Sequence, residues 1–233
     1  MKHYLKQNLL QRRTFYDATN VSDVVFKLYG NILKKKYKLP YKNKLTTVLD
    51  FGCGQGATVN FFNQCGFDAY GVDISKIDIE KAKTRYPHIA HKFTLCKPDS
   101  FNAPMTKYTE NKKISLISCI RSIYYFDKED FNTLLVNFKK SLKTKGLLYV
   151  SLISSSHTIY KFAKETKYQW LKKIEFKSNN VNLRNYFCFF TESKEDICKK
   201  FQIFKKIFVG SHHTELDKTN MNGHHYLFLC QKK

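Results

Sequence analysis

A carboxylate followed by alternating glycines is the part of this sequence that points most directly to chemistry. A short apolar run ends in Asp50, and the loop behind it carries glycine at 52, 54 and 56, in the stretch Val48-Leu49-Asp50-Phe51-Gly52-Cys53-Gly54-Gln55-Gly56. Glycine lets the backbone turn sharply and lets a ligand lie close to it. Amides at the start of a following helix can donate to a polar or anionic group. The pattern predicts a nucleotide-type cofactor, although a tight strand-to-helix turn would produce it as well.

A second carboxylate, Asp73, ends the next apolar run, 23 residues after Asp50. At the tip of a neighbouring strand it could accept hydrogen bonds from both hydroxyls of a ribose. The same spacing fits NAD, but the dinucleotide pattern G-x-G-x-x-G would place glycine where this chain has Ala57, an accepted variant. Asp50 argues further against NAD, because a carboxylate ahead of the glycines repels a pyrophosphate and suits a cofactor that carries an ammonium group.

The elements that would position these residues alternate between two hydrophobic periods. Helices are expected at 21–33, 76–85 (with Ser75 as N-cap), 131–142 and 194–201. Strands are expected at 46–49, 68–72, 92–96, 115–119, 147–153, 185–191, 204–209 and 225–230. This alternation predicts βαβ units and a mostly parallel sheet with both faces covered. The last two strands are joined by a short connection and should pair antiparallel.

Two segments lie outside this pattern. Residues 1–45 are expected to form an N-terminal helical cap, in which Tyr16 could cover the cofactor, and residues 46–233 a single domain. Residues 157–182 fit neither period and are interpreted as a helical insertion that lies over one end of the sheet as a lid.

The order of these segments resembles the class I S-adenosylmethionine-dependent methyltransferase family. The glycine loop is similar to the first motif of that family, and Gly71-Val72-Asp73-Ile74-Ser75 to the second. Three more segments match in the expected order, at 99–101, 122–126 and 142–148. Ser115 stands where the family often has an acid, and Lys145-Gly146 replaces its usual Pro-Gly-Gly, but neither position touches cofactor chemistry. The resemblance covers about 45–154 and implies a Rossmann-like, doubly wound α/β fold, with helices on both faces of a mostly parallel seven-stranded sheet that has an antiparallel strand near the C-terminus.

The resemblance also implies how S-adenosylmethionine and its product S-adenosylhomocysteine would be held. Asp73 would bind the ribose, Ile74 would pack on the adenine and Asp99 would accept from the adenine amino group. The amides near Gly52 and Gly54 would line the methionine end. The expected cofactor-binding residues are Asp50, Gly52, Cys53, Gly54, Asp73, Ile74, Asp99, Ser100 and Cys119.

Residues that follow the fourth and fifth strands are the candidates for work on the methyl acceptor, because ligands of open α/β sheets lie outside the carboxyl ends of the strands. These residues are Arg121, Tyr124, Tyr125 and His157. We expect His157, Tyr124 and Tyr125 to act in catalysis, with His157 as a base for a hydroxyl acceptor. The alternatives are a solvated loop histidine and two tyrosines that serve packing.

The formal net charge of +22 would attract polyanions through counterion release. Only five of the 41 basic residues are arginine, however, and the lysines are scattered. Proteins that recognise phosphates and bases specifically favour arginine, because its guanidinium group can donate two parallel hydrogen bonds. The charge therefore fits a solvated surface shaped by an AT-rich coding bias. The Asn/Asp-Pro-Pro-aromatic segment of base-flipping amino methylases is replaced here by Ser118-Cys119-Ile120-Arg121.

We therefore expect a small-molecule acceptor, such as a sugar, a glycan precursor or a lipid-derived metabolite, methylated on oxygen or nitrogen. Nucleic acid is a possible but less favoured partner. An RNA methyltransferase and a non-catalytic cofactor-binding protein of the same fold are the alternatives.

Cysteine usage and hydropathy suggest the cellular compartment in which the protein functions. The seven cysteines form no C-x-x-C pair and there is no apolar signal stretch, which favours reduced thiols in the cytoplasm. No apolar run approaches the roughly 18 residues that a membrane span needs. The adjacent pairs His212-His213 and His224-His225 are a weak signal for metal, and none is expected.

Overall fold

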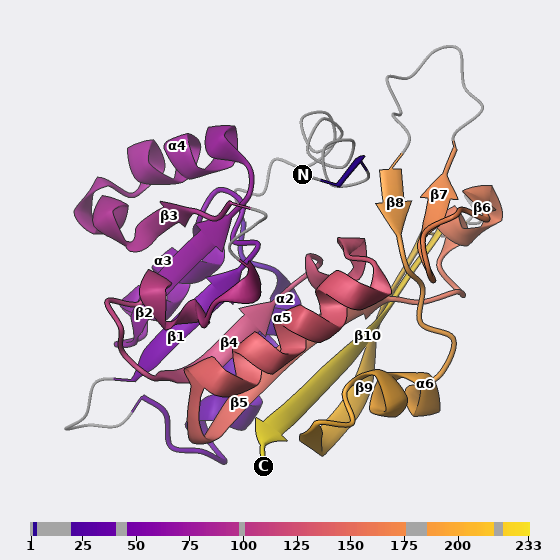
Figure 1. The fold of residues 1–233 in the computed structure, drawn as a ribbon. Coiled ribbons are helices and arrows are strands. Elements are labelled where there is room, and N and C mark those ends of the chain that lie inside the picture. The colour runs from indigo at the N-terminus through magenta and orange to yellow at the C-terminus, as the bar shows by residue number, and fades with distance from the viewer. Residues whose placement is uncertain (1, 4–19, 41–45, 98–100, 176–185, 217–220) are drawn as a thin grey trace.

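A seven-stranded sheet organises the protein, and its strand order is β3-β2-β1-β4-β5-β10-β9 (Figure 1). The computed structural model describes residues 2–3, 20–40, 46–97, 101–175, 186–216 and 221–233. The pairs among β1 to β5 are parallel, whereas β10 runs antiparallel to β5 and β9. The predicted mostly parallel sheet with an antiparallel strand near the C-terminus is thus confirmed. The strands are β1 (Thr47–Phe51), β2 (Asp68–Asp73), β3 (Phe93–Leu95), β4 (Ile114–Cys119), β5 (Leu142–Ile153), β9 (Phe204–Leu216) and β10 (Met221–Lys232).

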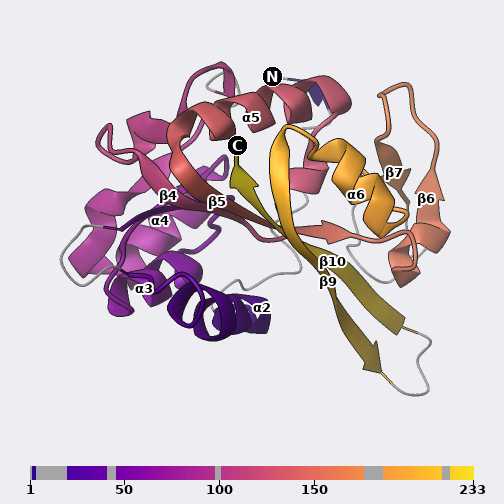
Figure 2. The same cartoon turned by 90° about the horizontal axis from the view of Figure 1, so that it is seen from below.

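Helices cover both faces of this sheet (Figure 2). One face carries α2 (Asp23–Lys27), α3 (Ala57–Gln64) and α4 (Lys76–Arg85), and the other carries α5 (Lys128–Ser141) and α6 (Lys194–Lys200). A π-helical segment, Leu28–Lys34, continues α2. Four short 3-10 turns within the described residues connect the larger elements: Pro87–Lys92, Met105–Tyr108, Ile123–Tyr125 and Thr158–Phe162.

Two buried clusters hold the layers together, because successive side chains of a strand point to opposite faces. In β5, Tyr149 is buried on the α2–α3 side with Val24 and Leu229, whereas Val150 is buried on the α5 side with Phe138. The expected helix at 76–85 is confirmed, and the Ser75 hydroxyl caps it by accepting from the Asp78 amide at 3.3 Å.

The predicted N-terminal cap needs correction where the structure describes it. Val24, Val25, Leu28 and Leu33 are buried against one face of the sheet, in the same cluster as Leu116. Residues 23–34 therefore form a layer of the core and not a separate cap over the strand ends. The apolar period that predicts this helix is satisfied by the sheet itself.

The predicted helical insertion at 157–182 is wrong in its secondary structure. After the short turn Thr158–Phe162 the chain forms β6 (Ala163–Lys164) and β7 (Lys172–Ile174), which join β8 (Tyr186–Cys188) in a small antiparallel sheet. This sheet lies beside the carboxyl ends of β4 and β5 (Figure 1). Strand pairing with β8, distant in sequence, outweighs the local pattern; residues 176–182 of the predicted lid are outside the described ranges.

The last hairpin is longer than predicted. β9 and β10 pair continuously from Phe204↔Lys232 to Leu216↔Met221, with one irregularity near Cys230. Beyond its pairing with β5, the hairpin projects away from the body of the domain (Figure 2). The two late strands pair antiparallel, as expected.

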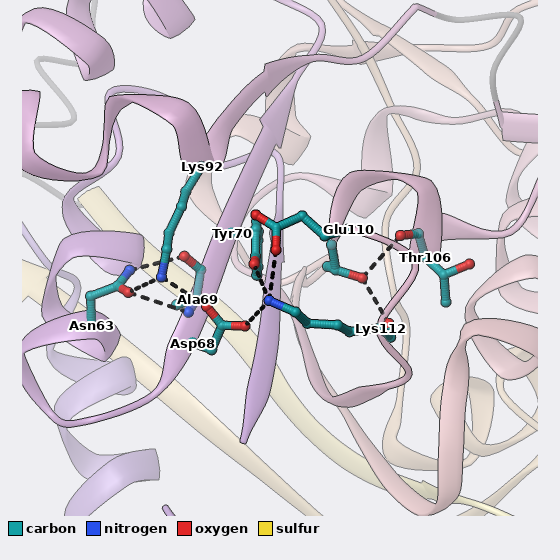
Figure 3. Close-up of polar contacts among 9 residues, drawn as sticks. Asn63, Asp68, Ala69, Tyr70, Lys92, Thr106, Glu110 and Lys112 are labelled. Atoms are coloured by element: carbon teal, nitrogen blue, oxygen red, sulfur yellow. Dashed lines mark hydrogen bonds and ion pairs between the residues drawn. The ribbon is translucent and has the colours of Figure 1, made fainter. Parts of the chain in front are cut away.

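A partly buried ion cluster fixes the start of β2 (Figure 3), at the opposite end of that strand from Asp73. Asp68 accepts from Lys92 at 2.8 Å and from Lys112 at 3.1 Å, and Lys112 also donates to the Tyr70 hydroxyl at 2.8 Å. Burial alone would raise the pKa of Asp68, but the two lysines outweigh it and lower the pKa. The cluster is structural, since it lies at the amino ends of the strands.

Candidate functional site

The glycine loop and the tip of β2 are joined by direct hydrogen bonds. The Gly54 amide donates to Asp73 Oδ2 at 2.9 Å, and the Ser75 amide donates to Asp73 Oδ1 at 2.9 Å. The amides of Gly52 and Cys53 both donate to the Val72 carbonyl, at 2.8 and 3.0 Å. The two motifs recognised in the sequence therefore form one compact unit.

These bonds limit the hydrogen bonds that the amides near Gly52 and Gly54, which are expected to line the cofactor, can donate to it. Three consecutive loop amides are already used inside the protein, because the loop folds back over β2. A pyrophosphate needs amide donors from such a loop, whereas an ammonium group needs acceptors. The arrangement thus fits a cofactor with an ammonium group better than a dinucleotide.

Close packing explains why glycine is required in the loop. Gly52 has φ +79°, and a Cβ atom there would lie 2.4 Å from Cβ of Ser122, in the loop that follows β4. The Ser122 hydroxyl donates to the Phe51 carbonyl at 2.7 Å. The loops after β1 and β4 thus touch at the point where the strand order reverses, which is where ligands of doubly wound sheets bind.

Asp50 is buried at this switch point. Its side chain accepts from the Ser118 hydroxyl of β4, and only 4% of the residue is exposed. Burial raises its pKa to about 7; the Ser118 hydrogen bond acts in the opposite sense, and the charge of Asp73 adds to the rise. Sequence reasoning missed Ser118, since a serine inside a strand carries no local signal for pairing with a distant carboxylate.

The remaining expected cofactor residues occupy different environments. Ile74 is half-buried against the α5-side core. Cys119 is fully buried, and the Cys53 sulfur packs where a Cβ on Gly71 would lie, 2.8 Å away. Both cysteines thus direct their side chains into the core. Asp99, Ser100 and Tyr16 lie outside the described residues.

A further polar group in the loop has no assigned partner. Gln55 is 3% exposed, and its carboxamide oxygen accepts no hydrogen bond from any described residue. Such a buried acceptor is costly unless a donor reaches it. It adds an unsatisfied acceptor to a loop that already fits an ammonium-bearing ligand.

The predicted acceptor residues come together at the ends of β4 and β5. The ring centroids of Tyr124 and Tyr125 are 4.6 Å apart, and those of Tyr125 and Tyr186 are 6.2 Å apart. His225 of β10, which sequence reasoning missed, lies 5.3 Å from the ring of His157 and 6.3 Å from that of Tyr124. These five rings, of Tyr124, Tyr125, Tyr186, His157 and His225, lie next to one another, and we refer to them as the ring wall.

The small antiparallel sheet holds this wall in place. The Phe189 amide donates to the Tyr124 carbonyl at 2.9 Å, and the Trp170 indole donates to the Phe126 carbonyl at 3.1 Å. The loop after β4 is therefore fixed by residues from the region that follows β5.

His157 is neutral at physiological pH. Burial lowers its pKa to about 4, with smaller contributions from the charges of Arg121 and His224. Its Nδ1 accepts from the Ile159 amide at 3.2 Å, so the hydrogen of the neutral ring resides on Nε2. The free edge of this imidazole is consequently a donor, which suits substrate binding better than proton abstraction.

No cluster of three or more His, Cys, Asp or Glu side chains in the described part of the chain is arranged to hold a metal ion. Among the helices that the structure describes, none is long and apolar enough to cross a membrane.

Together, the buried Asp50, the glycine loop and its bond to Asp73 at the switch point define a cofactor-binding Rossmann-like domain. The chain matches the family model of the methyltransferase domain over residues 26–201, and so it belongs to that family. The expected enzyme class is confirmed, and with it S-adenosylmethionine as the cofactor.

Solved structures and a curated relative agree with this family. A SAM-dependent methyltransferase from Methanosarcina mazei superimposes with a TM-score of 0.65 at 13% identity, covering 91% of this chain and 98% of that one. Magnesium protoporphyrin IX methyltransferase from Synechocystis PCC 6803, with bound SAH, gives 0.57 at 15% identity, covering 90% and 80%. The mRNA cap guanine-N(7) methyltransferase of Schizosaccharomyces pombe is 29% identical over 127 residues, which are 52% of this chain and 35% of that protein. This chain thus spans about a third of the length of that relative.

Proposed function

We propose that this methyltransferase transfers the methyl group of S-adenosylmethionine to an oxygen or nitrogen atom of a small-molecule acceptor, such as a sugar, a glycan precursor or a lipid-derived metabolite. The cofactor supplies an activated methyl group. The acceptor lone pair forms a bond to the methyl carbon as the carbon–sulfur bond breaks, S-adenosylhomocysteine leaves, and the acceptor loses a proton to solvent or to a nearby base. The protein's task is binding, alignment and exclusion of water.

On the cofactor side, two buried carboxylates have separate proposed roles. Asp73 is oriented by the Gly54 and Ser75 amides and would bind the ribose, with Ile74 against the adenine. Asp50 would balance the ammonium group of the methionine end, and a nearby cation would favour its ionised form. Cys53 and Cys119 would contribute by packing beneath the cofactor, since their side chains are buried in the core and the Cys53 amide is bound to Val72.

The ring wall is the observation that carries the small-molecule assignment. Tyr124 and Tyr125 follow Ser122, which packs against Gly52 of the cofactor loop, and the rings of His157 and His225 continue the wall from there. The Tyr124–Phe189 backbone bond holds it in place. Each of these rings combines an aromatic face with a polar tip, and aromatic surface with a small number of placed polar groups is typical of sites that enclose small ligands. We propose that residues 157–182 act as a lid over it, with its described strands and turn in place of the helix expected from sequence.

An RNA acceptor is the second candidate, because two observations favour it. The curated relative from Schizosaccharomyces pombe is an mRNA cap guanine-N(7) methyltransferase, and the net charge of +22 would attract a polyanion. The scarcity of arginine and the ring wall weigh against it.

Transfer of a labelled methyl group decides between these acceptors. The protein would be incubated with methyl-labelled S-adenosylmethionine and either a small-molecule extract or total RNA, at physiological salt. We expect label in the small-molecule fraction and only weak RNA binding that disappears as salt rises. Label in RNA, with sub-micromolar RNA binding at physiological salt, would replace the proposal by the RNA methyltransferase.

All seven cysteines are free thiols, which supports a reducing compartment. We propose a cytoplasmic location on that basis, to be tested by fractionation of the cells that produce the protein.

A further inference from the structure

A small pocket lies between α2, the loop after β4 and the adjacent strands β5, β10 and β9. It is lined by residues of α2 and its N-cap, the loop after β4, and β5, β9 and β10, namely Ser22, Val24, Arg121, Ser151, His212, His225 and Leu227. Strand register brings these positions together, since Leu227 pairs with Ser151 and His225 pairs with His212. The pocket shares His225 with the proposed acceptor site.

Arg121 enters this pocket in an unusual backbone conformation. Its φ is +55°, in the left-handed region that non-glycine residues rarely adopt, and its amide donates to the Ser151 hydroxyl at 2.8 Å. A non-glycine residue in this region is strained and persists where the surroundings fix it, often at a functional site. The loop thus places Arg121 at the acceptor side of the sheet.

Arg121 also carries a half-buried charge that needs a counter-ion. Within the described ranges no carboxylate forms an ion pair with its guanidinium. The carboxylate on the α2 side, Asp23, already binds Lys27 at 3.2 Å and His212 at 3.1 Å, and is exposed. A partly desolvated cation without a partner is unfavourable, and a bound anion would relieve this cost.

His225 and Ser151, which line the pocket with Arg121, are not negatively charged and can donate hydrogen bonds. Burial lowers the pKa of His225 to about 3, with the charge of Arg121 second, so this imidazole is neutral at pH 7 and keeps one N–H. The Ser151 oxygen accepts from the Arg121 amide and retains its own hydrogen to donate. A guanidinium fork beside neutral donors is suited to a carboxylate or a phosphate.

We propose that Arg121, Ser151 and His225 form an oxyanion subsite that binds a phosphate or carboxylate group of the methyl acceptor. The inference rests on the proposed function and makes it narrower, since the acceptor becomes an anionic small molecule. The subsite anchors the charged group next to the ring wall, so that the acceptor atom faces the cofactor loops.

Binding of simple anions tests the subsite without knowledge of the acceptor. Calorimetry at constant ionic strength would compare inorganic phosphate, glucose 6-phosphate, glucuronate and neutral glucose. We expect phosphate or carboxylate probes to bind and glucose not to bind, and Arg121→Gln to weaken the anion by about tenfold or more. The phosphate and uronate arms show which oxyanion the site prefers.

Arg85→Gln is the matched control, because Arg85 is an exposed arginine on α4. Equal losses in the two variants, or no anion binding by the wild type, would overturn the subsite. Binding of an RNA oligonucleotide that depends on Arg121, with no response to the small anions, would overturn it in favour of an RNA contact.

Two further measurements keep these outcomes separable. Binding of S-adenosylhomocysteine is recorded in every variant, so that its absence in the wild type reports failure of the proposed function and not of the subsite. If Arg121→Gln does not fold, Ser151→Ala provides the second variant, with the same expected loss of anion affinity and intact binding of S-adenosylhomocysteine.

Discussion

The backbone amide of Gly54 donates to a carboxylate oxygen of Asp73 across 2.9 Å, and this bond joins the glycine loop to the second strand of the sheet. Asp73 therefore has two tasks: it holds the loop in shape and, in our proposal, it binds the ribose. A substitution at this position is expected to affect both the shape of the loop and the binding of the cofactor.

Replacement of Asp73 by Ala should weaken S-adenosylhomocysteine binding by about 2 to 3 kcal/mol, because the ribose hydroxyls lose charge-assisted partners. This corresponds to a rise in Kd of about 30- to 150-fold, measured by calorimetry. Glu80→Gln, at an exposed position on α4, is the control and should leave Kd unchanged. An unaltered Kd in a folded Asp73→Ala protein would show that this acid has another role.

The buried Asp50 should make the free enzyme less stable as pH rises. Its folded pKa of about 7 lies above the unfolded value, so the folded state binds more protons between the two pKa values and the free energy of unfolding falls across that window. Asp50→Asn removes this dependence and should stabilise the protein at pH 8 in urea denaturation, while weakening S-adenosylhomocysteine. A wild-type slope retained in Asp50→Asn would assign the titration to another group.

Ser118→Ala tests the ionisation of Asp50 without changing the carboxylate itself. The Ser118 hydroxyl donates to Asp50 and lowers its pKa, so removal of the hydroxyl should raise the pKa further. The midpoint of the pH-dependent stability change should then move to higher pH. A midpoint that stays in place would show that the hydrogen bond does not control the ionisation of Asp50.

The ion cluster around Asp68 should contribute stability and leave cofactor binding alone. Asp68→Asn leaves Lys92 partly buried beside a neutral group, and we expect a loss of about 2 to 3 kcal/mol in the free energy of unfolding. The exposed Lys76–Glu80 pair is the control, since Lys76→Ala should cost almost nothing. A weaker affinity for S-adenosylhomocysteine in Asp68→Asn would contradict the structural role.

The stability contributed by the ion cluster around Asp68 should also be lost at acidic pH. The pKa of Asp68 is lowered in the fold, against its burial, by Lys92 and Lys112, so the stabilisation is fully present above the unfolded pKa. It disappears as pH falls through the lower folded pKa. Wild type and Asp68→Asn should therefore converge in stability at low pH.

His157→Asn tests whether the imidazole is a base or a binding group. Asn can still cap the turn that begins at Thr158, and it removes the ring. Because the pKa of His157 is about 4 and Nδ1 is engaged, we expect a higher KM, a modest change in kcat and no change in the pH profile between about 5 and 8. His91→Asn, at an exposed position, is the control.

A loss of kcat by about 100-fold or more, together with a disappearing break in the pH profile, would instead identify His157 as the general base. The acceptor that carries label in the transfer experiment is the substrate for these measurements.

Local patterns were sufficient to predict the architecture of the sheet and the position of the cofactor loops. The apolar runs that end in Asp50 and Asp73 and the glycines with positive φ reflect sterics within a few residues, so they can be recognised in the chain. The same holds for the helix that begins behind Ser75. The strands at 163–174 escaped prediction because their pairing with β8 is not local.

What the tertiary structure decided is the chemical state of the site. Asp50 acquires its high pKa from burial between β1 and β4, which outweighs the opposing hydrogen bond from Ser118, and His225 comes near Arg121 because the antiparallel β10 lies against β5. The loop amides look free in the sequence, yet the fold directs them to Val72 and Asp73. Sequence determines which residues stand at the strand ends; burial and pairing between distant segments determine their charge and the hydrogen bonds left for a ligand.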